Sequence, residues 1–145
     1  MQQQQIEQKT SMKRIKQIYF FTGAASLIHF VITGILLRIN FFSVDHSDVS
    51  GRMMFRANHI YILLCGLQNL LLHFTISPAQ KQNGFIFLSF TLTVVATLGL
   101  NISFYFDPIS HLLQRNLTKL SIIGLFSGIV LHLLCLQFSR HSTGN

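Results

Sequence analysis

Four long apolar segments, separated by shorter polar ones, make up most of this chain. None of the four contains Lys, Arg, Asp or Glu, and they cover residues 18–37, 57–76, 85–106 and 120–138. About 20 helical residues are needed to cross the roughly 30 Å hydrocarbon core of a bilayer, so each segment is long enough. The pattern predicts four transmembrane helices, over residues 15–37, 55–76, 85–106 and 117–138.

Buried helices of a water-soluble bundle are the alternative interpretation of these segments. Charged residues make up only 10% of the chain, whereas 50% of the residues are hydrophobic. Soluble domains carry about 25% charged residues, and a soluble bundle of the present composition would have too little polar surface to face water. The composition therefore favours an integral membrane protein.

Short polar links between the segments predict an all-α, antiparallel, up-down-up-down bundle, because sequential helices joined by short links become neighbours. We expect one domain over residues 15–138. The glutamine-rich residues 1–14 have little to bury and are predicted to be disordered or to lie on the membrane surface. Residues 139–145 are predicted to form a short polar tail.

The basic residues flank the apolar segments, with a cluster before the first one at Lys9, Lys13, Arg14 and Lys16. This placement is typical of headgroup contacts and topology signals, and it argues against nucleic acid as a partner despite the net charge of +7. By the positive-inside rule we expect both termini in the cytoplasm, and we place the chain in a bacterial inner membrane.

Histidines lie within the apolar segments at His29, His59, His73 and His132. His59, Gly66 and His73 are seven residues apart and so share one helix face, which places the two histidines about 21 Å apart along the axis. This spacing resembles the paired haem-ligand histidines of b-type cytochromes. The predicted topology pairs His29 with His59 and His73 with His132, but the members of each pair differ in depth by about 5 to 7 Å.

Three interpretations of these histidines stay open. They are neutral groups that hydrogen-bond between helices, which is the ordinary role of polar residues in a membrane bundle. They are axial ligands of haem b, since neutral imidazole binds haem iron well. They line a proton or ion pathway, because ionisable residues in membranes are costly and often functional.

Acidic and histidine side chains also gather in two loops, where they suggest a divalent metal site. The candidate ligands are Asp45, His46, Asp48, Asp107 and His111. Their oxygen and imidazole groups suit such a metal, although neither loop has a recognised metal-binding spacing. Solvated loop charges paired with Arg52 and Arg115 are the alternative.

The start of the second segment is polar, with Arg52, Arg56 and His59 on one face and Tyr61 nearby. Snorkelling arginines and a tyrosine in the aromatic belt would anchor the helix at the interface. The alternative is that Arg56 and its neighbours hold an anionic headgroup, a quinone carbonyl or a haem propionate. Residues 56–64 resemble a run in small four-span bacterial membrane proteins, and the resemblance implies only that Arg56 and His59 belong to a shared feature.

Enzymatic activity is not indicated by any motif in the chain. The sequence has no nucleophile elbow, phosphate-binding loop or zinc-protease motif, and its apolar segments contain no carboxylate. We therefore predict a structural or accessory role, as a homo-oligomer or as a subunit of a larger membrane complex. A haem-binding electron carrier and a small transporter or channel are the alternative functions.

Overall fold

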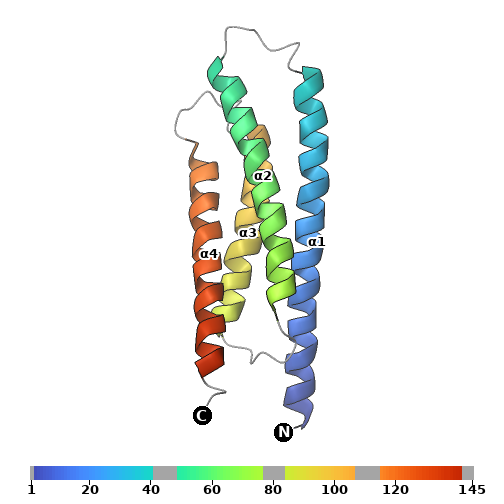
Figure 1. The fold of residues 1–145 in the computed structure, drawn as a ribbon, viewed down its shortest axis with the longest axis vertical. Coiled ribbons are helices and arrows are strands. Elements are labelled where there is room, and N and C mark those ends of the chain that lie inside the picture. The colour runs from blue at the N-terminus through green and yellow to red at the C-terminus, as the bar shows by residue number, and fades with distance from the viewer. Residues whose placement is uncertain (1, 41–48, 77–83, 107–114, 142–145) are drawn as a thin grey trace.

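Four α-helices make up the described part of the computed structural model, which covers residues 2–40, 49–76, 84–106 and 115–141. They are α1 (Gln2–Asn40), α2 (Val49–Thr75), α3 (Gly84–Phe106) and α4 (Asn116–His141). Successive helices run in opposite directions, and α1 begins at the same end of the bundle at which α4 ends (Figure 1). The predicted all-α, up-down-up-down bundle is thus confirmed over the described ranges.

The first helix is longer than the sequence pattern predicts. The sequence pattern predicts that residues 1–14 are disordered or lie on the membrane surface, and in the structure α1 begins at Gln2 and continues without interruption. Met12 and Ile15 are buried against Leu72 and Ile76 of α2 and the segment after it, and against Ile86 of α3. The polar residues of this segment are mostly glutamine and lysine, which favour helices, so a few buried apolar side chains suffice to hold it in place. At the other terminus, α4 continues through His141 into the predicted polar tail.

Glycines allow α1 to approach α2 and α3 to approach α4. A Cβ atom on Gly66 would lie 3.0 Å from Leu27 Cδ2, and one on Gly23 would lie 3.0 Å from the carbonyl oxygen of Gly66. A Cβ atom on Gly128 would lie 3.2 Å from the carbonyl oxygen of Ser89. These two helix pairs form the most extensive packing in the bundle, α3 also packs on α2 and α1, and α2 and α4 do not pack closely together.

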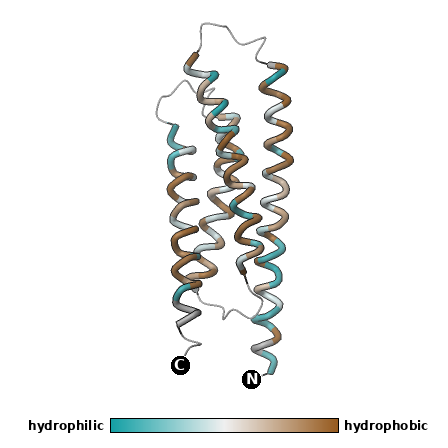
Figure 2. Tube along the Cα trace, viewed as in Figure 1, coloured by the Kyte–Doolittle hydropathy of each residue, from teal (hydrophilic) through white to brown (hydrophobic). Residues whose placement is uncertain are grey.

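Polar side chains share the interior of the bundle with an apolar core, and large apolar side chains cover much of its exterior. Within the described ranges, seven polar residues have no exposed surface: Thr33, Asn58, Asn69, Ser89, Thr93, Thr97 and Ser103. In contrast, more than 60% of the surface of each of Phe21, Leu71, Phe74 and Leu120 is exposed. Hydrophobic residues run along most of the length of the four helices, and polar ones gather toward the start of α1 (Figure 2). This arrangement is the reverse of that in a water-soluble bundle.

Three stretches of helix are long and apolar enough to cross a membrane, namely Ile6–Ile39, Gly84–Phe106 and Asn116–Gln137. They belong to α1, α3 and α4. The remaining helix, α2, has sufficient length but carries five amide and imidazole side chains: Asn58, His59, Gln68, Asn69 and His73. These side chains lower its mean hydropathy, because α2 supplies much of the polar interior.

Candidate functional site

His29 is joined to α3 through both of its ring nitrogens. Its Nδ1 lies 2.5 Å from Asn101 Oδ1, and its Nε2 lies 2.8 Å from the Tyr105 hydroxyl. Because an amide oxygen only accepts hydrogen bonds, Nδ1 carries a proton and donates it to Asn101. The rings of His29 and Tyr105 also stack, with centroids 5.5 Å apart. Both ring nitrogens of His29 are therefore engaged by side chains of α3.

Asn101 extends this contact into a network that reaches three helices. Its Nδ2 donates to Ser26 Oγ on α1 at 3.1 Å and to the Thr97 carbonyl oxygen at 2.8 Å. The Thr97 hydroxyl in turn accepts a hydrogen bond from Asn69 Nδ2 on α2 at 2.8 Å. Thr97 and Asn101 thus lie on the face of α3 along which α1 and α2 dock.

His59 is held on the same side of the bundle by Thr33 and Phe30 of α1. Its Nδ1 lies 2.9 Å from Thr33 Oγ1, and its ring stacks on Phe30 with centroids 4.1 Å apart. The single hydroxyl proton of Thr33 is donated to the His29 carbonyl oxygen at 2.9 Å. His59 therefore donates from Nδ1 to Thr33.

The other two predicted ligands lie toward the opposite end of α2. His73 donates from Nδ1 to the Lys16 carbonyl oxygen on α1 at 2.8 Å. His132 of α4 is only 1% exposed, and its Nε2 lies 3.2 Å from the Thr75 hydroxyl. All four membrane histidines thus bond to protein groups, as the polar-contact interpretation predicts.

The geometry of these histidines differs from that of a bis-histidine haem site. In each predicted pair, the hydrogen bond described for the α2 histidine is made by Nδ1. In contrast, Nε2 of His29 is engaged by Tyr105, and Nε2 of His132 by Thr75. Gly66, which lies between the two α2 histidines on the same helix face, packs against Leu27 and Gly23 of α1. Haem ligation requires these contacts to open, and it stays a prediction.

Asn58 joins the start of α2 to neighbouring parts of the bundle. Asn58 is fully buried, whereas Arg56 is exposed. Asn58 Nδ2 donates to the Ser103 carbonyl oxygen at 3.0 Å, and Asn58 Oδ1 accepts a hydrogen bond from Arg115 Nη2. The Arg115 guanidinium lies 6.0 Å from the centre of the Tyr61 ring, within the range of a cation–π contact. This cluster joins α2 to α3 and to the start of α4.

Sequence reasoning did not single out Asn58, although a signal for it is present. Asn58, Ile62, Cys65 and Asn69 recur at four- and three-residue steps, and all four are buried. Such a repeat marks one face of a helix. It identifies the face of α2 that packs into the bundle.

The predicted metal ligands Asp45, His46, Asp48, Asp107 and His111 lie outside the described residues. Within the described ranges, no group of three or more His, Cys, Asp or Glu side chains is placed to hold a metal ion. The metal site in the loops stays a prediction.

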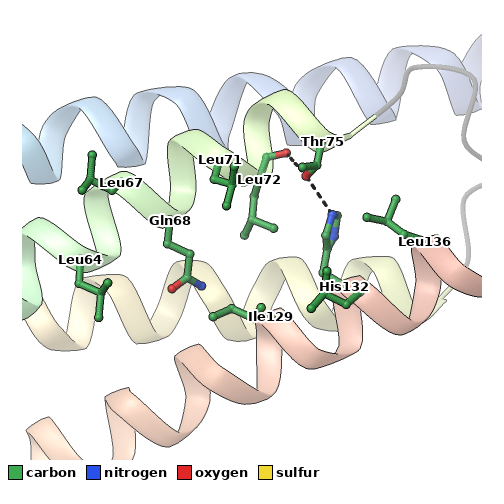
Figure 3. Close-up of a pocket in the computed structure, with 10 residues that line it drawn as sticks. Leu64, Leu67, Gln68, Leu71, Leu72, Thr75, Ile129, His132 and Leu136 are labelled. Atoms are coloured by element: carbon green, nitrogen blue, oxygen red, sulfur yellow. Dashed lines mark hydrogen bonds between the residues drawn. The ribbon is translucent and has the colours of Figure 1, made fainter.

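The sequence pattern does not predict a groove that lies between α2 and α4. It has a volume of about 330 Å³ and is lined mainly by leucine side chains, with three polar ones (Figure 3). Gln68 points toward the groove from α2, and its Nε2 is buried without a hydrogen-bond partner. His132 and Thr75 close the groove near the end of α2 (Figure 3).

Comparison with known proteins adds no further assignment. No protein-family model, no curated protein and no solved structure matches this chain.

Proposed function

We propose that the chain is a structural or accessory protein of a membrane, with all four helices across the bilayer. The distribution of side chains carries this proposal. Most amide and hydroxyl groups that point inward bond to backbone carbonyls or to one another, and many large apolar groups are exposed on the outside. Such a bundle has an interior held by hydrogen bonds and an exterior suited to lipid tails.

The inclusion of α2 as a fourth span follows from its outward face. Leu64, Leu67, Leu71 and Phe74 are exposed at three- and four-residue steps, so they form an apolar stripe on the side away from the buried amides. A helix between two membrane-spanning neighbours must reverse the direction of the chain. With α1 and α3 running in the same direction, α2 returns the chain across the bilayer (Figure 1).

An accessory role accounts for both the filled interior and the apolar exterior. Within the described residues, the polar side chains mostly bond to backbone carbonyls or to groups on neighbouring helices, as in packing interfaces. The exposed apolar faces offer contacts to further transmembrane helices. We propose that the chain associates with a membrane complex or with further copies of itself.

Cysteine labelling tests the four-span arrangement. Ser50 and Gly84 lie at opposite ends of the bundle, near the start of α2 and at the start of α3. In a background without Cys65 and Cys135, a membrane-impermeant maleimide should label Ser50→Cys in intact cells, and Gly84→Cys only after permeabilisation. Labelling of both positions from one side would overturn the proposed span of α2.

Purification from native membranes in a mild detergent tests the accessory role. We expect the chain to emerge with a stoichiometric membrane partner or as a homo-oligomer, measured by native mass spectrometry. A monomer alone, obtained under conditions that keep other membrane complexes intact, would contradict this role.

A further inference from the structure

We infer that the groove between α2 and α4 binds an uncharged, lipid-soluble carbonyl compound, with Gln68 as its hydrogen-bond donor. The inference rests on the proposed membrane location, because the groove then opens toward lipid. The lining residues come from these two helices alone: Leu64, Leu67, Gln68, Leu71, Leu72, Thr75, Ile129, His132, Leu133 and Leu136.

The size of the groove excludes a helix as the occupant. From Leu64 to Thr75 it extends about 16 Å along α2. A helix about 10 Å across would need roughly 1,200 Å³ over that length, whereas the groove offers about 330 Å³. This volume lies at the lower end of the range for small-molecule pockets. It suits a single hydrocarbon chain or a substituted ring.

The lining favours an uncharged occupant. Seven of the ten lining residues are leucine or isoleucine, and none is Lys, Arg, Asp or Glu. An ionised group placed there would lose its hydration without gaining a counter-charge, which is strongly unfavourable. Long-chain acids and amines in their charged forms are therefore poor ligands.

The polar groups of the groove favour a ligand that carries an acceptor oxygen. The Thr75 hydroxyl donates to the Leu72 carbonyl oxygen at 3.1 Å, so the proton between Thr75 and His132 comes from the imidazole. Gln68 Nε2 is then the donor that is buried and has no partner. A carbonyl oxygen in the groove would satisfy it, and an unsubstituted hydrocarbon would leave it unsatisfied.

The depth of Gln68 distinguishes a dissolved carbonyl compound from a membrane phospholipid. Gln68 lies seven residues, or about 10 Å, from Thr75 at the end of α2. That position is within the hydrocarbon core, whereas the ester carbonyls of phospholipids lie near the headgroups. The occupant is therefore a molecule whose carbonyl enters the bilayer interior, such as a long-chain ketone.

Photolabelling tests the proposal with the full chain in phosphatidylcholine nanodiscs. The probe is a long-chain ketone with a diazirine on its chain, and mass spectrometry locates the adducts. We expect adducts within residues 64–75 and 129–136. An excess of 2-undecanone should suppress them at least tenfold more effectively than undecane. Equal competition by the alkane, or adducts spread over all the helices, would overturn the inference.

Two variants separate the hydrogen bond from the shape of the groove. Gln68→Leu keeps a similar volume but removes the donor, and it should reduce ketone labelling about tenfold and abolish the preference over undecane. Leu67→Trp should fill the groove and abolish labelling of both groove segments, residues 64–75 and 129–136, by the ketone probe. Gln17→Leu and Leu98→Trp, both at exposed positions outside the groove, should label as the parent chain does.

Circular dichroism verifies the helix content of each variant before labelling. A folded Gln68→Leu variant that labels like the parent would overturn the role of Gln68, and a folded Leu67→Trp variant that labels like the parent would overturn the site itself. The maleimide result at Ser50 and Gly84 is independent of the groove. A chain that passes that topology test but shows no specific ketone labelling would leave the proposed function standing and remove only this inference.

Discussion

His29 Nδ1 lies 2.5 Å from Asn101 Oδ1, so one hydrogen bond links α1 to α3 across 72 positions of the sequence. Interhelical hydrogen bonds in membrane proteins contribute about 0.6 kcal/mol on average and up to about 1.7 kcal/mol. Asn101 also bonds to Ser26 on α1. We expect Asn101→Leu to lower the free energy of unfolding by about 1–2 kcal/mol in an SDS titration.

A double-mutant cycle isolates the His29 contact from the rest. His29→Phe combined with Asn101→Leu should show a coupling energy of about 0.5–1.5 kcal/mol. Thr91→Val serves as the control, because the Thr91 hydroxyl bonds only to the Phe87 carbonyl oxygen of its own helix and the residue is exposed. A coupling energy near zero would show that the His29 and Asn101 contact adds nothing to stability.

Gly66→Ala is expected to destabilise the α1 and α2 pair by about 1–3 kcal/mol, the usual cost of overpacking. The added methyl would meet Leu27 at 3.0 Å and the Gly23 carbonyl oxygen at 3.3 Å, and a backbone atom cannot rotate away. Gly84→Ala is the matched control, since no atom lies within 4 Å of its added Cβ. Thermal unfolding in detergent measures both variants, and equal stabilities would show that α1 and α2 do not approach this closely.

Asn58→Leu should reduce stability by about 1–3 kcal/mol, because Arg115 Nη2 and the Ser103 carbonyl oxygen would each lose a partner. Asn58→Asp keeps the acceptor for Arg115 and should therefore lose less stability than Asn58→Leu does. Asn116→Leu, at an exposed position on α4, should change stability by less than about 0.5 kcal/mol. The same unfolding assay ranks the three variants, and a ranking with Asn116→Leu as the most damaging would contradict the role of Asn58.

An absorption spectrum addresses the haem hypothesis directly. Because both nitrogens of His29 are engaged and Gly66 is covered by α1, we expect detergent-purified protein from haem-sufficient cells to show no Soret band, with or without added haemin. A Soret band that disappears in both His59→Ala and His73→Ala would reverse this conclusion and restore the bis-histidine interpretation.

The helices could be predicted from the sequence because lipid imposes a length and an apolarity that are visible in one chain. The predicted helix over residues 85–106 differs by one residue from α3. The start of α1 was missed, since its helix depends on Met12 and Ile15 meeting residues of α2 and α3. Local polarity carries no information about such distant contacts.

The site was harder to predict, because periodicity identifies a helix face but not what covers it. The seven-residue spacing of His59, Gly66 and His73 suits a haem and a close helix contact equally, and the structure places α1 against Gly66. The groove at Gln68 depends on α2 and α4 remaining apart, which is a property of the whole bundle. The hydrogen bonds of His29, His59, His73 and His132 are those expected under the first of the three interpretations, polar contacts between helices.

Glycine contacts and hydrogen bonds join different pairs of helices, and this difference has a consequence for assembly. Glycine contacts hold α1 to α2 and α3 to α4, whereas most of the interhelical hydrogen bonds run between these two hairpins, as at Asn69 with Thr97. The α1–α2 hairpin and the α3–α4 hairpin can thus each insert and pack independently. The polar groups then form the hydrogen bonds that join one hairpin to the other. Two half-chains, one ending after α2 and one starting at α3, should therefore find each other in a bilayer and rebuild the bundle.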